Sequence, residues 1–101
     1  MKTEQEIRDS LAVAGIPANM HDGVVRYLLH GVRPGSFLSA LFANDFVACC
    51  VRADAENTAA LPDWAAWIIN HAPASCRGSY LAIERWCTAR YLAERKQEVQ
   101  S

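Results

Sequence analysis

Apolar residues recur at helical spacing along most of the chain, in short segments separated by glycines, prolines and polar capping residues. The first segment begins at Thr3, whose hydroxyl can cap a helix while Glu6 completes the spacing of a capping box. A narrow apolar stripe follows, and Gly15 ends it. We expect residues 1–15 to form an accessory helix that docks on the edge of the core.

The second segment, residues 16–41, contains two helix signals on either side of a turn. Pro17 suits the first turn of a helix, and valines and leucines at helical spacing follow it. Gly31 predicts a left-handed helix stop, and Pro34-Gly35 predicts a turn. Ser36 is the predicted N-cap of the next helix. Helices joined by so short a connection should lie antiparallel or cross steeply.

Residues 37–51 carry a broad apolar surface that continues through Asn44-Asp45. Two interpretations remain open for this segment. Either Asn44-Asp45 divides it into two helices, with the aspartate starting the second, or it is one kinked helix. A polar break at residues 52–57 follows, in which Asp54 or Asn57 can cap the next helix.

The next predicted helix begins near Leu61, with Pro62 in its first turn. Its apolar stripe consists of Leu61, Trp64, Ala65, Ile68 and Ala72. Trp67 lies about 60° from this stripe, so we expect it to be less buried than the other tryptophans.

Residues 70–79 read as a loop, and Ser79 is the expected cap of a last helix over residues 80–97. That helix carries apolar residues on two sides, which predicts two packed faces. No alternating β-branched run and no Asn-Gly hairpin signal occurs. We therefore predict an all-α fold, a compact single-domain bundle of five or six short helices over residues 1–101.

The composition narrows the classes of function. Hydrophobic residues make up 51% of the chain and charged residues 21%, which is typical of a globular protein. The net charge of −1 indicates neither a strongly basic nucleic-acid binder nor a strongly acidic DNA mimic. The chain opens on a polar segment and no apolar run approaches about 18 residues, so we expect no signal peptide and no membrane association.

The four cysteines and three histidines do not have the spacing of a structural zinc site. Cys49 and Cys50 are adjacent and would point about 100° apart on a helix. Cys76 lies near His71 in the predicted loop, but no signature of a catalytic thiol surrounds it. We expect inert, reduced thiols, no metal, no cofactor and no enzymatic activity.

DNA recognition would require a helix with several polar and basic side chains. The segment 46–51 is too apolar for that role. Only the last helix carries enough cations, and its tryptophan and tyrosine positions resemble a core stripe. The sequence therefore disfavours nucleic acid as the partner.

Several motifs together resemble a family of small proteins from phages and prophages of proteobacteria. They are MHDGVVRYLLHGVRPGSFL at residues 20–38, Asn44-Asp45, Arg52-Ala53-Asp54 with Asn57, and NHAPASCRGS at residues 70–79. The resemblance covers about residues 16–86 and leaves the first segment outside it. It implies a phage context and a location in the host cytoplasm, but it assigns no activity and no site residue.

These observations favour an accessory protein that acts by stoichiometric binding to a host protein or immune complex. Its most concrete version is an inhibitor of a bacterial defence system, in the manner of anti-CRISPR proteins, and that step rests on genomic analogy. Aromatic and arginine side chains commonly anchor interfaces, and the candidates are Arg33, Trp67, Arg77 and Arg85. Two alternatives remain open, namely a small nucleic-acid-binding regulator and a self-associating structural protein of the phage, and the oligomeric state is undetermined.

Overall fold

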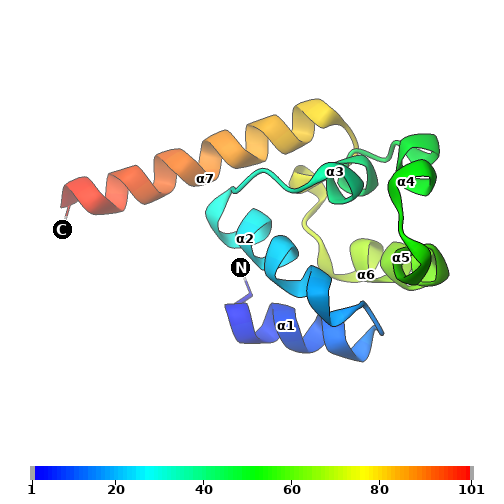
Figure 1. The fold of residues 1–101 in the computed structure, drawn as a ribbon. Helices are drawn as coiled ribbons and strands as arrows, with labels where there is room; N and C mark the ends of the chain where they lie inside the picture. The colour runs from blue at the N-terminus through cyan, green and yellow to red at the C-terminus, as the bar shows by residue number, and fades with distance from the viewer. Residues whose placement is uncertain (1, 101) are drawn as a thin grey trace.

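The computed structural model describes residues 2–100, with side chains described as far as Gln97. The α-helices are α1 (Glu4–Val13), α2 (His21–His30), α3 (Ser36–Phe42), α4 (Phe46–Arg52), α5 (Ala55–Ala59), α6 (Leu61–His71) and α7 (Tyr80–Gln100), as drawn in Figure 1. Two 3-10 turns, η1 (Ala18–Met20) and η2 (Ala74–Cys76), complete the helical elements. No strand occurs within residues 2–100, which confirms the predicted all-α class.

The described residues form seven α-helices, so the prediction of five or six is too low. The additional helix is α5, in the segment expected to be only a polar break. Asp54 caps it by accepting a hydrogen bond from the backbone N–H of Asn57 at 2.8 Å. Five residues are too few to show an apolar period, so the sequence pattern does not reveal this helix.

Several helix boundaries follow their local signals. Thr3 and Glu6 form the capping box of α1, and Gly31 ends α2 with a left-handed φ of 66°. The predicted cap Ser36 is wrong by one residue, because Gly35 occupies the cap position and Ser36 is the first residue of α3. Caps depend only on neighbouring residues, which is why sequence locates them closely.

The segment 37–51 resolves into two helices. Asn44 adopts a left-handed φ of 62° directly after α3, and the chain then turns into α4. Asp45 caps α4 by accepting a hydrogen bond from the N–H of Ala48 at 3.3 Å. Asparagine tolerates left-handed φ better than most residues, so Asn44-Asp45 both ends one helix and starts the next.

The core gathers side chains from α1, α2, α3, α6 and α7. Helix α1, expected at the edge of this core, buries Ile7 and Leu11 while packing against α2 and α6. Tyr27 of α2 is fully buried and donates its hydroxyl to the carbonyl oxygen of Cys76 at 2.6 Å. This bond fixes η2 against α2 from the inside of the molecule.

All three tryptophans are buried, so the expectation of a more exposed Trp67 is wrong. Trp67 is 1% exposed because α1 covers its side of α6, and its indole N–H donates to Oγ of Ser10 at 2.9 Å. The indole of Trp64 donates to Oδ1 of Asn57, and that of Trp86 to the carbonyl oxygen of Tyr27. Each buried indole N–H therefore has an acceptor, as buried donors require.

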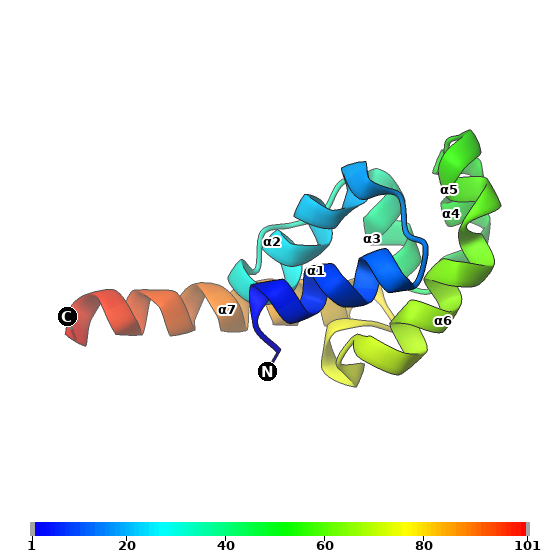
Figure 2. The same cartoon turned by 90° about the horizontal axis from the view of Figure 1, so that it is seen from below.

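Helix α7 begins at the expected place, where Oγ of Ser79 accepts a hydrogen bond from the N–H of Ala82 at 3.0 Å. Its first two turns bury Ile83 and Trp86, but Leu81 and Leu92 are exposed. The prediction of two packed faces is therefore wrong. Figures 1 and 2 show that the C-terminal half of α7, which carries Leu92, extends beyond the other helices.

Candidate functional site

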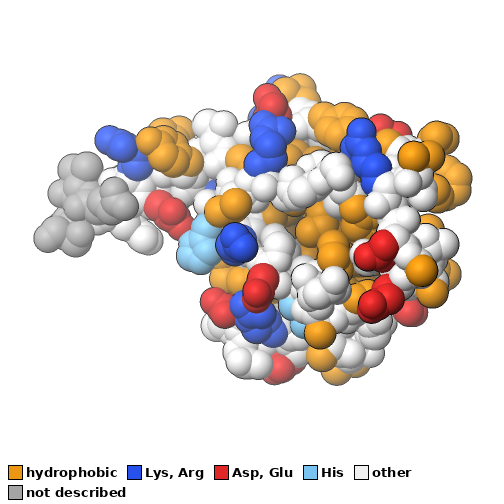
Figure 3. All heavy atoms as spheres, viewed as in Figure 1, with side chains coloured by type: hydrophobic (Ala, Val, Ile, Leu, Met, Phe, Trp, Pro, Cys, Tyr) orange, Lys and Arg blue, Asp and Glu red, His pale blue; other side chains and the backbone are white. Residues whose placement is uncertain are grey.

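Helix α4 leaves half of its apolar side chains exposed. Phe46, Val47 and Val51 are 75%, 70% and 78% exposed, and Cys49 is the only buried residue of this helix. Figure 3 shows the corresponding cluster of hydrophobic side chains at the right edge of the molecule, over α4. Scattered exposed apolar residues are ordinary, but three on one short helix form a patch that calls for a covering surface.

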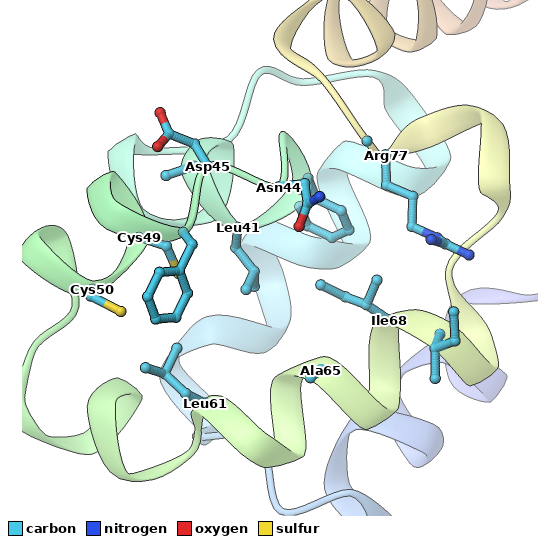
Figure 4. Close-up of a pocket in the computed structure, with 14 residues that line it drawn as sticks. Leu41, Asn44, Asp45, Cys49, Cys50, Leu61, Ala65, Ile68 and Arg77 are labelled. Atoms are coloured by element: carbon cyan, nitrogen blue, oxygen red, sulfur yellow. The ribbon is translucent and has the colours of Figure 1, made fainter.

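A groove of about 370 Å³ lies beside this patch, between the α3–α4 corner and α6. Leu41, Phe46 and Cys50 line one wall, and Leu61, Ala65 and Ile68 line the other. Figure 4 shows Cys50 and Leu61 toward one end of the groove and Arg77 toward the other. We use the name α4–α6 surface for these six residues and Arg77 together with the exposed side chains of Val47 and Val51.

Hydrogen bonds hold the segments next to each wall of the groove in place. At one end, α5 joins α4 to α6, and the buried side chain of Asn57 accepts the indole N–H of Trp64 at 3.0 Å. At the other end, the N–H of Gly78 donates to the carbonyl oxygen of Phe42 at 2.8 Å. Both connections next to the groove are therefore fixed to neighbouring helices by hydrogen bonds.

The carboxylate of Asp45 at the rim is already engaged within the molecule. Its Oδ2 accepts a hydrogen bond from the hydroxyl of Tyr80 at 2.7 Å, and its Oδ1 accepts one from the N–H of Ala48. These two bonds, that of Tyr80 first, hold the pKa of Asp45 below its usual value because they stabilise the ionised form. Asp45 thus serves as a structural cap more than as a free anion.

Arg77 is the cation of the groove. Its Nε donates a long hydrogen bond of 3.5 Å to the carbonyl oxygen of Ala72, and its side chain is half-buried. Among the side chains that the structure describes, no carboxylate lies within 4.0 Å of the Arg77 guanidinium. The groove is therefore mainly apolar, and the one guanidinium in its lining has no ionic partner among the side chains as far as residue 97.

The predicted interface residues do not form one site. Arg77 lines the groove, whereas Arg33 makes an exposed ion pair with Glu84 of α7 at 2.6 Å. Arg85 lines a separate hollow between η2 and α7, and Trp67 lies in the core. Of the four candidates, only Arg77 belongs to the α4–α6 surface.

Three of the four cysteines are poorly placed for catalysis. Cys76 is completely buried, and this burial raises the pKa of its thiol to about 11. Burial also raises the pKa of Cys49 and of Cys87. A reactive thiol needs the opposite, a lowered pKa and access to solvent. Within the part of the chain that the structure describes, no three histidine, cysteine or acidic side chains are grouped so as to hold a metal ion.

The exposed residues of α4 are the main functional candidates that sequence reasoning missed, because their apolar character suggested core. A usable signal was present in the composition of this short segment. Phe46 to Val51 holds six successive apolar residues, and no single buried face of a helix can accommodate all of them. At least one side of such a helix must face solvent or a partner.

No family model matches this chain, and no match to it is found among curated proteins or solved structures. Among residues 2–100, none of the helices combines the length and apolar character needed to cross a lipid bilayer. Inference about function therefore depends on the surface itself.

Proposed function

We propose that this chain acts by binding another protein stoichiometrically through the α4–α6 surface. The observation that carries the proposal is the exposure of Phe46, Val47 and Val51 on one helix beside an apolar groove. Burial of an apolar side chain of this size contributes roughly 1.5–3 kcal/mol. A few such anchors at the centre of an interface commonly supply most of the binding free energy.

The more specific version is a phage or prophage protein that binds a host protein and inhibits a bacterial defence system. This version is supported by the resemblance of residues 16–86 to small phage and prophage proteins, and by no feature of the groove. Excess expression of the protein in bacteria carrying different defence systems tests it. Restriction of phage growth should weaken in at least one strain, and unchanged restriction in every strain would contradict it.

Affinity capture from a proteobacterial lysate tests the general proposal, provided that it is made with matched variants. The tagged protein should retain a stoichiometric partner that mass spectrometry identifies. Val47→Asp should abolish this retention, because it places a charge in the exposed apolar patch. Val13→Asp is the control, since Val13 of α1 is also highly exposed, at 89% against 70% for Val47, but lies outside the α4–α6 surface.

Two outcomes would contradict the proposal. One is retention of the same partner at the same level by Val47→Asp. The other is equal loss from Val47→Asp and Val13→Asp, which would show a general effect of added charge. Circular dichroism of both variants checks that each remains folded.

Self-association is the second candidate, because the same apolar patch could pair with its counterpart on another copy of the chain. It predicts a dimer or larger species in sedimentation of the purified protein at micromolar concentration, which Val47→Asp converts to a monomer. If the wild-type protein sediments as a monomer, self-association is excluded and binding to a different protein remains.

A nucleic-acid-binding regulator has less support from the described cations. Arg8 and Arg33 face carboxylates at 2.9–3.0 Å and 2.6 Å. The guanidinium of Arg90 lies over the ring of Trp86 at 4.5 Å from its centroid. Salt-dependent binding of duplex DNA would favour this alternative over protein binding.

A further inference from the structure

The chemistry of the α4–α6 surface restricts the backbone conformation of a peptide that can bind to it. Most residues that line the groove belong to α3, α4 and α6, whose backbone N–H and C=O groups are largely occupied within the helices. Of the lining residues outside these helices, Asn44, Asp45 and Gly78 already donate their backbone N–H groups to carbonyl oxygens of α3. No strand lies within residues 2–100, so the described structure offers no sheet edge to a bound peptide. An extended peptide would therefore find few backbone partners in the groove.

This restriction favours a helical occupant. A peptide backbone that enters an apolar groove without hydrogen-bond partners leaves polar groups unsatisfied, which is costly. A helix satisfies its own backbone and presents apolar side chains from one face, at spacings of three or four residues. Leu41, Ala65 and Ile68 line the groove in which such side chains would lie.

The charged residues at the groove indicate which charge the bound helix should carry. Asp45 is already hydrogen-bonded to Tyr80 and Ala48, so it does not call for a cation. Arg77 lies toward one end of the groove, and its guanidinium has no carboxylate partner among the described side chains. A carboxylate on the occupant would complete this arrangement with charge-assisted hydrogen bonds.

We infer that the groove accepts an amphipathic helix of the partner protein, with apolar side chains one turn apart against Leu41, Ala65 and Ile68 and an acidic side chain that pairs with Arg77. This inference rests on the proposed function and adds the chemistry of the partner to it. Arg77 is then the residue that selects acidic over basic helices.

Selection from two peptide libraries tests the inference. One library holds randomised peptides of about 15 residues that a cross-link keeps helical, and the other holds peptides kept extended by regularly spaced prolines. The immobilised full-length protein should enrich helical peptides with apolar residues at spacings of three or four and at least one Asp or Glu. Binding of the enriched peptides is then measured by fluorescence anisotropy.

Charge reversal distinguishes a specific pair from general attraction. Arg77→Glu should weaken binding of the acidic helical peptides by about tenfold or more, and it should strengthen binding of twins in which Lys replaces the acidic residue. Arg85→Glu is the matched control, because Arg85 lies outside the groove, and it should change either affinity by less than about twofold. Ala65→Arg should abolish binding of both peptide types by filling the groove.

The inference is overturned if only extended peptides are enriched, if the helical peptides show no acidic preference, or if Arg77→Glu and Arg85→Glu act equally. It is also overturned if a second copy of the chain occupies the groove, seen as a dimer that Ala65→Arg dissociates. None of these outcomes decides the proposed function, which the lysate capture with Val47→Asp tests separately.

Discussion

Tyr80, the first residue of α7, donates its hydroxyl hydrogen bond to Asp45, the residue that caps α4, at 2.7 Å. The bond joins the start of the longest helix to the corner at which α3 ends and α4 begins. It also holds one rim of the groove in position, because Asp45 lies in its lining. A surface contact between two residues that are 35 positions apart in the sequence thus supports the candidate site.

Removal of this hydroxyl should change the titration of Asp45. In Tyr80→Phe the pKa of Asp45 should rise toward its usual value, because the hydrogen bond of Tyr80 is the main cause of its lowered pKa. A lowered folded-state pKa contributes stability above the unfolded pKa of about 4, and this contribution is lost as the pH falls through the folded value. Carboxyl NMR titration and acid unfolding of both proteins measure the effect, and an identical Asp45 titration would contradict it.

Removal of the buried amide of Asn57 should cost stability. Asn57→Ala leaves the indole N–H of Trp64 without its acceptor inside the core, which costs about 2 kcal/mol. Urea unfolding measures the free energy change, with Asn70→Ala as the control because Asn70 is exposed. Similar small losses in the two variants would mean that the Asn57–Trp64 bond has no net stabilising role.

Gly31 and Gly35 flank the connection between α2 and α3 and should respond differently to substitution by alanine. Gly31 has a φ of 66°, and an added Cβ would lie 2.6 Å from Cβ of Arg90 and 2.8 Å from the carbonyl oxygen of Cys87. Gly31→Ala should therefore lower the free energy of unfolding by about 2 kcal/mol or more. Gly35→Ala should be tolerated, since no atom lies within 4 Å of its added Cβ. Thermal unfolding compares the two, and equal melting temperatures would contradict this packing of α2 against α7.

Alkylation rates should separate the cysteines. With a thiol pKa of about 11 and no exposed surface, Cys76 should resist iodoacetamide at pH 8 until the protein unfolds. Cys50 is partly exposed in the groove lining and should react while the protein is folded. Mass spectrometry of peptides after timed quenching locates the modified residue. Rapid native labelling of Cys76 would contradict its burial.

The parts of the fold that sequence predicts well are those set by neighbouring residues. The capping box of Thr3 and Glu6, the left-handed Gly31 and the cap at Asp45 each require only a few adjacent positions. Helix α5 was hidden because five residues show no apolar period, and its cap at Asp54 is the only local sign of it.

The candidate site was less predictable because it depends on which helix covers which. Trp67 and Val47 are both apolar residues on helices, yet α1 covers Trp67 while no described element covers Val47. Their periodicity is similar, so only the packing of distant segments separates core from surface. The residue type of Arg77 predicts an interface role, but its position beside α6 follows from the turn through η2.

Hydrogen exchange of the protein, alone and bound to the partner recovered from the lysate, tests the central claim most directly. Binding through the α4–α6 surface predicts slower exchange of backbone amides in α4 and in α6, Phe46–Arg52 and Leu61–His71. Exchange in α1 and in the C-terminal half of α7 should stay unchanged. Protection confined to α1 or α7, with α4 and α6 exchanging as in the free protein, would contradict the claim.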